Sequence, residues 1–138
     1  MKIIIDTNIL LSALIKDSVT RKILIEAEWQ FFYPQMSFHE VRKHKDLVLD
    51  KSGMKNEEYI QVLNQLFQNI ELIPEESIYP SLKEANDIIG KIDPDDAVFL
   101  AAALGIPNSL IWSDDSDFDK QLKVKILKTK DVVKLFYV

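Results

Sequence analysis

Short apolar runs alternate along the chain with apolar positions at helical spacing. The β-branched run at residues 3–5 predicts a buried strand over residues 1–5, and similar runs predict strands over residues 31–33, 70–73, 109–112 and 124–127. Spacings of three and four predict helices over residues 8–16, 20–29, 37–51, 56–68, 80–89, 94–104 and 130–136. The core is expected to include the aromatic side chains Trp29, Phe31, Phe32, Tyr33 and Trp112. Strands that alternate with helices are typical of a parallel sheet covered on both faces.

Turn and capping residues mark several of these boundaries. Ser37 followed by Glu40 is a capping-box pattern, Pro80 is typical of a first helical turn, and Asp93 before Pro94 is typical of an N-cap. The sequence contains no linker, internal repeat or low-complexity tract. We therefore predict one domain over residues 1–138, with an α/β fold: a three-layer α/β/α sandwich around a central, mostly parallel sheet.

Composition limits the chemistry that the chain can perform. At 138 residues its length suits one domain. The absence of cysteine excludes thiolate catalysis, cysteine zinc sites and disulfides, and it suits a reducing compartment. The apolar run at the N-terminus is too short for a signal peptide, and no run approaches the roughly 18 apolar residues of a membrane helix. A cytoplasmic location is therefore expected.

Acidic residues gather where predicted strands end and predicted helices begin. Asp6 follows the first strand, and Asp114, Asp115 and Asp117 follow the strand over residues 109–112. The remaining acids, at predicted helix starts, are Glu40, Asp93, Asp95 and Asp96. Ligands bind at the carboxyl ends of the strands in an open parallel sheet, so these acids are expected at one rim.

Clustered carboxylates favour a bound cation. They repel one another and raise each other's pKa unless a cation neutralises them. Oxygen ligands without histidine or cysteine favour Mg²⁺ or Mn²⁺ over zinc, and His39 and His44 are five residues apart rather than the four that align two ligands on a helix. One or two such ions suit phosphodiester hydrolysis with an activated water.

Each acid taken singly also has a structural interpretation. Asp6 can be a capping side chain, and Glu40 can be the third-position acid of its capping box. Asp93 can be an N-cap, while Asp95 and Asp96 complement the helix dipole. The acids between residues 114 and 119 can form a solvated turn.

Taken in order, the motifs resemble those of the PIN-domain nucleases, which include the toxins of VapC-type toxin–antitoxin pairs. The matching segments are Ile-Ile-Ile-Asp-Thr-Asn at residues 3–8, residues 34–41 around Glu40, the alanine-rich helix over residues 96–103, and Ser-Asp-Asp-Ser-Asp-Phe at residues 113–118. They extend from residue 3 to residue 118, nearly the whole chain.

The resemblance implies a set of site residues. Asp6, Glu40, Asp96 and Asp115 would be the catalytic metal-binding quartet, with Asp117 as a fifth, supporting ligand. Asn8 and Ser113 would orient the carboxylates, and Ser113 stands where the family often has threonine. The third acid is one of Asp93, Asp95 and Asp96, of which the spacing to the following alanines favours Asp96. A slip of one residue around Asp114 and Asp115 stays open.

The resemblance also implies an activity and partners. The expected reaction is in-line hydrolysis of RNA by a Mg²⁺- or Mn²⁺-dependent endoribonuclease, which leaves a 5′-phosphate and a 3′-hydroxyl. The expected partners are an RNA substrate, a small antitoxin protein and a second copy of the chain in a homodimer. Which RNA is cut does not follow from the sequence.

The net charge of −5 is unusual for a protein that binds nucleic acid. Setting aside the five expected site acids leaves the rest of the chain neutral. The basic residues gather in two groups, and Arg42, Lys43 and Lys45 beside Glu40 are the candidate substrate contacts. The second group is Lys120, Lys123, Lys125, Lys128 and Lys130. Both groups can equally be ordinary solvated faces.

Two other functions fit part of the pattern. A phosphoaspartate domain is one, but a phosphatase of that kind needs a second aspartate where this chain has Asn8. A receiver needs an aspartate at the end of a middle strand, where the chain has Pro34 or Pro74. The other is a non-catalytic PIN-like module that binds RNA or protein, against which the full set of acids argues.

Overall fold

The computed structural model describes residues 1–91 and 93–138. The strands are β1 (Lys2–Ile5), β2 (Gln30–Pro34), β3 (Ile70–Ile73), β4 (Ser109–Trp112) and β5 (Ile126–Leu127). The α-helices are α1 (Thr7–Ile15), α2 (Val19–Glu26), α3 (Phe38–Lys43), α4 (Lys45–Ser52), α5 (Asn56–Phe67), α6 (Glu75–Ala85), α7 (Pro94–Gly105) and α8 (Thr129–Phe136). Shorter helical turns are η1 (Gln35–Ser37), η2 (Asn86–Gly90), which is π-helical, and η3 (Ser116–Lys120).

All paired strands of the sheet are parallel, in the order β3-β2-β1-β4-β5. From the central β1, the chain builds β2 and β3 on one side and then returns to build β4 and β5 on the other. Ile4 of β1 therefore lies between Phe32 of β2 and Ile111 of β4. The direction of strand addition reverses between β1 and β4, which places a crevice at their carboxyl ends.

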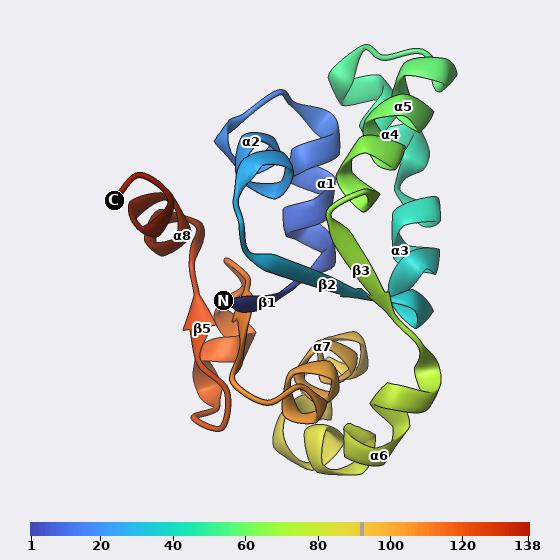
Figure 1. Cartoon of the computed structure of the whole chain (residues 1–138). Helices are drawn as coiled ribbons and strands as arrows, with labels where there is room; N and C mark the ends of the chain where they lie inside the picture. Colours follow the sequence, from blue (N-terminus) through green and yellow to red (C-terminus); the bar gives the residue numbers. More distant parts are fainter. Residues whose placement is uncertain (92) are drawn as a thin grey trace.

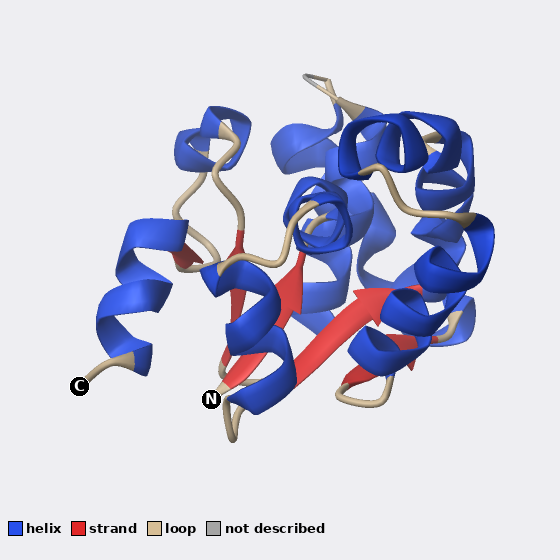
Figure 2. Cartoon of the chain, turned by 90° about the horizontal axis from the view of Figure 1, so that it is seen from above, coloured by secondary structure: helices blue, strands red, loops and turns tan. Residues whose placement is uncertain are grey.

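Helices cover both faces of this sheet, which confirms the predicted three-layer α/β/α fold. Figure 1 shows α1 and α2 on one side of the strands and α6 and α7 on the other, with α8 beside β5. Figure 2 shows the twisted strands from above, flanked by helices. None of the helices in residues 1–91 and 93–138 is long and apolar enough to cross a membrane.

The core lies between the central strands and the two helix layers. Ile3, Ile4 and Ile5 of β1 are fully buried because both faces of this strand are covered. On α7, Leu100 and Ala101 are also fully buried, and its small alanines let the helix approach the sheet closely. The predicted burial of Phe31, Phe32, Tyr33 and Trp112 is confirmed, whereas Trp29 is half-buried.

The single helix predicted over residues 37–51 is wrong, because two helices, α3 and α4, meet at His44. The backbone of His44 leaves the helical region (φ −98°, ψ 7°), and its Nδ1 lies 2.8 Å from the carbonyl oxygen of Glu40. The predicted capping box is also wrong, since Ser37 makes no side-chain capping bond. Glu40 is therefore free to contact residues outside its own helix.

The predicted helix start at Pro80 is wrong as well. Helix α6 begins at Glu75, and Pro80 lies inside it. Pro74 precedes the first turn, and Glu75 and Glu76 in that turn complement the helix dipole. Packing of α6 against α7 outweighs the loss of one backbone donor at Pro80. The edge strand is also shorter than residues 124–127, because only Ile126–Leu127 pairs with β4.

Candidate metal centre

A small cavity of about 100 Å³ lies at the carboxyl ends of β1 and β4. Its lining residues come from four parts of the chain: Asp6, Thr7 and Asn8 after β1, Glu40 on α3, Asp93, Asp95, Asp96 and Phe99 around the start of α7, and Asp115 after β4. The parallel sheet brings these segments together because their strands end at the same edge. The four acids expected to form the metal-binding quartet all line this cavity.

Asp6 is the most firmly held of these acids. Its Oδ1 accepts a hydrogen bond of 2.9 Å from the backbone N–H of Ile9, so it caps α1, and its Oδ2 accepts from the hydroxyl of Ser113. Burial raises the pKa of Asp6 to about 6, although both hydrogen bonds act to lower it. Asp6 therefore caps α1, as its structural interpretation expects, and also lines the cavity.

Ser113 connects the two strand ends. It is fully buried, it donates to Asp6, and its Oγ accepts a bond of 3.0 Å from the backbone N–H of Asp115. Asp115 in turn caps η3, because its Oδ1 accepts from the backbone N–H of Asp117 at 2.9 Å. One hydroxyl thus fixes both the Asp6 carboxylate and the loop that carries Asp115.

The neighbouring Asp114 points elsewhere. Its two carboxylate oxygens accept from the backbone N–H of Thr129 at 2.8 Å and from the Thr129 hydroxyl at 2.6 Å. Thr129 is the first residue of α8, so Asp114 binds the start of that helix, and Thr129 Oγ1 also accepts from Trp112 Nε1 at 3.0 Å. Of the two candidate registers, Asp115 is therefore the acid that faces the cavity.

Asp96 provides the clearest sign that the cavity can take a ligand. Its side chain is only 8% exposed, and its Oδ2 is buried without a hydrogen-bond partner among the described residues. Burial is the main cause that raises its pKa to about 7, and the nearby Asp93, Asp115 and Asp117 add to the shift. A buried carboxylate oxygen without a partner is costly, so this atom indicates a site for a proton or a cation.

Asp96, Asp115 and Asp117 form the tightest group, with one carboxylate oxygen of each within 4.8 Å of the others. Asp117, expected as a supporting ligand, belongs to this group but is not among the residues that line the cavity. Asp6 and Glu40 line the cavity with Asp96 and Asp115 but are not part of the group.

The other two acids at the start of α7 are exposed or already used. Asp93 caps the helix, because its Oδ1 accepts from the backbone N–H of Asp95 at 2.9 Å. Asp95 is exposed at the rim of the cavity. Of these three acids only Asp96 is buried, and it is also the acid that the spacing to the following alanines favours.

Glu40 is held by a residue from another helix. Thr7 Oγ1 donates to Glu40 Oε1 at 3.1 Å, and the Tyr33 hydroxyl lies 2.8 Å from the same Thr7 oxygen. Partial burial raises the pKa of Glu40. Sequence reasoning assigned no role to Thr7 or to the Tyr33 hydroxyl. Thr7 lies beside Asp6 in the motif, but Tyr33 gives no sequence signal beyond its place in an aromatic strand.

The remaining predicted helpers and basic residues differ in their surroundings. Asn8 lines the cavity but is exposed, and its side chain makes no hydrogen bond within the described part of the chain. Arg42 and Lys43 are exposed on α3. Arg42 Cζ lies 5.8 Å from the centre of the Phe38 ring, and Lys45 Nζ lies 5.3 Å from the centre of the Tyr59 ring. From the second basic group, Lys128 Nζ donates to the Asp115 carbonyl at 3.3 Å and to Asp119 at 3.0 Å. Lys123 pairs with Glu84 at 3.7 Å.

The residues around the cavity fit a hard divalent cation. The donors are carboxylate oxygens, which Mg²⁺ and Mn²⁺ prefer. Asp96 Oδ2 has no competing hydrogen bond among the described residues, and mutual repulsion is one cause of the raised pKa of Asp6 and of Asp96. A cation would remove both unfavourable features.

Comparison with known proteins gives the family context of this geometry. A family model described as "PIN domain" matches residues 4–134. No curated protein sequence matches the chain. The fold is similar to a chain of VapBC2 from Rickettsia felis, in a crystal structure with a DNA fragment from their promoter, at 16% identity and a TM-score of 0.69, covering 93% of this chain and 98% of that one. It is also similar to a chain of VapBC-1 from nontypeable Haemophilus influenzae, at 17% identity and a TM-score of 0.65, with the same coverage.

Proposed function

The chain belongs to the PIN domain family, and from this premise we propose that it is a Mg²⁺- or Mn²⁺-dependent endoribonuclease of the VapC type. The observation that carries the proposal is the buried, unpartnered Oδ2 of Asp96 beside Asp115 and Asp117. An acid in that position destabilises the fold unless it has a ligand. The chemistry best served by such a ligand is hydrolysis of a phosphodiester.

We assign the metal to Asp6, Glu40, Asp96 and Asp115, with Asp117 as the supporting ligand. When bound, the ion supplies Lewis-acid stabilisation of the charge that develops during hydrolysis. The chain's own contribution is orientation. Ser113 and the Ile9 N–H hold the two oxygens of Asp6, and Ser113 also holds the backbone of Asp115. These contacts fix the ligands before the substrate arrives, which reduces the cost of reorganisation during the reaction.

The size of the cavity bears on how the substrate would bind. A volume of about 100 Å³ holds an ion and a few waters but not a nucleotide base. The RNA strand would therefore lie across the mouth of the cavity and present only its phosphate to the acids. Arg42 and Lys43 are exposed on the helix that carries Glu40, and we assign them to the flanking phosphates. Lys45 is a weaker candidate, because it is less exposed than Arg42 and Lys43.

The proposed partners follow from the family. The structures to which the fold is similar are VapBC assemblies by their descriptions, so a small antitoxin is the proposed protein partner of this chain. The further assignments are a homodimer, one PIN domain over residues 1–138, a cytoplasmic location, and products that carry a 5′-phosphate and a 3′-hydroxyl.

The test is cleavage of matched single-stranded RNA and DNA oligonucleotides with Mg²⁺, Mn²⁺ or EDTA. RNA cleavage that requires the divalent ion is expected, and Asp6→Asn should slow it by at least about 100-fold, because even outer-shell partners of a metal contribute 10- to 100-fold. Glu71→Gln is the matched control, since it removes one carboxylate from the opposite edge of the sheet and should leave cleavage unchanged. Cleavage that persists in EDTA would contradict the proposal.

A non-catalytic PIN-like module is the main rival. It predicts no cleavage of either substrate and no Mn²⁺ binding by calorimetry. Cleavage lost in Asp6→Asn, with Mn²⁺ binding in the wild type, would exclude this rival.

A further inference from the structure

A buried chain of hydroxyl groups leads from β2 to Glu40. The Tyr33 hydroxyl at the end of β2 lies 3.0 Å from the carbonyl oxygen of Ser37 and 2.8 Å from Thr7 Oγ1. Thr7, in the first turn of α1, donates in turn to Glu40 Oε1 at 3.1 Å. The contacts join Thr7 to Tyr33 and Glu40, which lie 26 and 33 residues further along the chain, and they end at an acid of the cavity.

The number of available protons determines which group donates in each of these hydrogen bonds. A hydroxyl group carries one proton, so Tyr33 donates either to Ser37 or to Thr7, and Thr7 donates either to Tyr33 or to Glu40. A carboxylate is a stronger acceptor than a neutral oxygen. With Glu40 charged, the Thr7 proton therefore belongs to Glu40. The Thr7 oxygen is then free to accept from Tyr33, whose one proton is shared with the Ser37 carbonyl oxygen.

Tyr33 is held rigidly by its surroundings. Its side chain is fully buried, and its ring lies 6.3, 6.2 and 6.0 Å from the ring centres of Phe38, Phe67 and Phe99. Thr7 is only 5% exposed. A hydroxyl on a fixed ring can hold Thr7 in one rotamer, because another rotamer would break the Thr7 contacts with both Tyr33 and Glu40.

Glu40 depends on this support. Its helix α3 spans only Phe38–Lys43, its side chain is partly exposed, and Thr7 is its one side-chain hydrogen-bond partner within residues 1–91 and 93–138. A glutamate has three rotatable side-chain bonds, so without that bond the carboxylate would sample several positions. The contrast with Asp6, which has two partners, makes Glu40 the ligand most sensitive to a change behind it.

We propose that Thr7 and Tyr33 are positioning residues that act in series, with Tyr33 orienting Thr7 and Thr7 orienting the Glu40 carboxylate toward the metal. Tyr33 is not among the residues that line the cavity, and its hydroxyl makes no hydrogen bond to a proposed metal ligand within the described residues, so its support reaches Glu40 through Thr7. This inference rests on the proposed function, because it assigns the residues that prepare one ligand of the same site.

The test uses Tyr33→Phe, which keeps the ring, Thr7→Val, which keeps the shape, and Thr7→Ser, which keeps the hydroxyl. Tyr59→Phe is the matched control, because Tyr59 is also a buried tyrosine but lies on α5 outside the cavity lining. Mn²⁺ affinity by calorimetry should weaken by about 3- to 10-fold in Tyr33→Phe and more in Thr7→Val, in line with the loss of one hydrogen bond. Thr7→Ser and Tyr59→Phe should stay within about 2-fold of the wild type.

A second readout needs no metal. The carboxyl ¹³C resonance of Glu40 in metal-free protein should move in Tyr33→Phe and Thr7→Val and stay in place in Tyr59→Phe. An unmoved resonance in both test variants would overturn the positioning role, whether or not the wild type binds Mn²⁺. Failure of the wild type to bind Mn²⁺ or cleave RNA would overturn the proposed function separately.

Discussion

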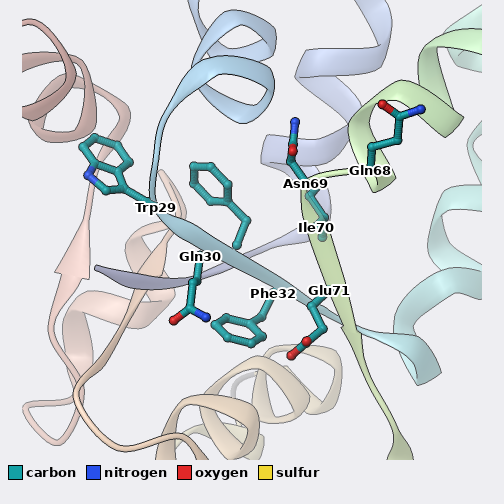
Figure 3. A pocket seen from close by; sticks show the side chains of 8 residues that line it. Trp29, Gln30, Phe32, Gln68, Asn69, Ile70 and Glu71 are labelled. Carbon is teal, nitrogen blue, oxygen red and sulfur yellow. The ribbon is translucent and has the colours of Figure 1, made fainter.

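One cavity lies at the amino ends of β2 and β3 and another at the carboxyl ends of β1 and β4, and the larger of these two has the less reactive lining. The cavity at the amino ends of β2 and β3 measures about 250 Å³ and includes Gln30, Asn69 and Glu71 among the residues of Figure 3. Its polar groups are mostly amides, and Asn69 Nδ2 already donates to the carbonyl oxygen of Ile25 at 2.9 Å. The cavity at the carboxyl ends measures only about 100 Å³ but is lined by six acids.

Unmet bonding capacity, and not volume, distinguishes the candidate metal centre from the cavity at the amino edge. Both edges belong to the same parallel sheet, so the architecture alone does not separate them. At the carboxyl edge, Asp96 is buried with an unpartnered oxygen and a raised pKa. At the amino edge, Glu71 is the one acid among the residues that line the cavity, and it is exposed.

The largest expected effect comes from Asp96→Asn. The variant removes one negative ligand, so RNA cleavage and Mn²⁺ affinity should each fall by at least about 100-fold, because ligand loss exceeds the 10- to 100-fold effect of outer-shell partners. The same change relieves burial of a charge, so the metal-free protein should melt at a higher temperature than the wild type at pH 8. Cleavage assays, calorimetry and thermal melts measure these three effects. Unchanged metal affinity would remove Asp96 from the site.

The next effect is a dependence of stability on pH in the metal-free protein. The pKa of Asp6 is raised from 3.8 to about 6 and that of Asp96 from 3.8 to about 7. Between these values the folded state binds more protons than the unfolded state, so the free energy of unfolding falls as the pH rises from about 4 to about 7. The loss should be on the order of a few kcal/mol, and the melting temperature should fall by roughly 5 °C or more.

A divalent ion should reverse that trend. Mn²⁺ binds the charged carboxylates, so at pH 8 it should raise the melting temperature of the wild type and have little effect on Asp96→Asn. Melts at pH 5 and pH 8, with and without Mn²⁺, measure both dependences. Equal melting temperatures of the metal-free wild type at pH 5 and pH 8 would contradict the raised pKa of Asp6 and of Asp96.

A smaller effect separates the adjacent acids Asp114 and Asp115. Asp114→Ala removes the partner of the first N–H of α8, which should cost about 1 kcal/mol of stability and leave cleavage at low temperature within a few-fold of the wild type. Asp115→Asn should show the opposite pattern, with cleavage lost and stability kept. Paired melts and cleavage assays decide the register, and an inactive but stable Asp114→Ala would reverse the assignment.

The smallest effect is expected from Glu71→Gln at the amino edge. The side chain is exposed and makes no ion pair among the described residues, so both stability and Mn²⁺ affinity should stay at the wild-type values. Calorimetry and melts run beside Asp96→Asn measure this difference. A loss of Mn²⁺ affinity in Glu71→Gln would break the contrast between the two edges.

The strands and most helices follow from local pattern. Residues 70–73 and 109–112 are short apolar runs, and the structure has strands there with the same bounds. The start of α6 at Glu75 does not follow from the sequence in this way, because Pro80 is typical of a first helical turn. Ile78, Leu82 and Ala85 follow helical spacing across that proline, and this periodicity was the better guide. The break at His44 has no such signal, since neither glycine nor proline lies near it.

The candidate site also has features that follow from the local sequence and features that do not. The acids were identified because they follow strands or begin helices, which is local information. The distinction between Asp114 and Asp115 depends on Thr129, and the support of Glu40 depends on Thr7 and Tyr33. These contacts join residues 15 or more positions apart, so they arise only from the folded chain.

Anomalous diffraction from crystals soaked in Mn²⁺ tests the proposed metal site most directly. In the wild type we expect an anomalous peak bonded to carboxylate oxygens of Asp96 and Asp115. This peak should be lost in Asp96→Asn, with no peak at the Gln30–Asn69–Glu71 cavity in either protein. A wild-type crystal with no peak at the carboxyl edge under saturating Mn²⁺, or an Asp96→Asn crystal with an equal peak there, would contradict the claim that this edge is a metal site.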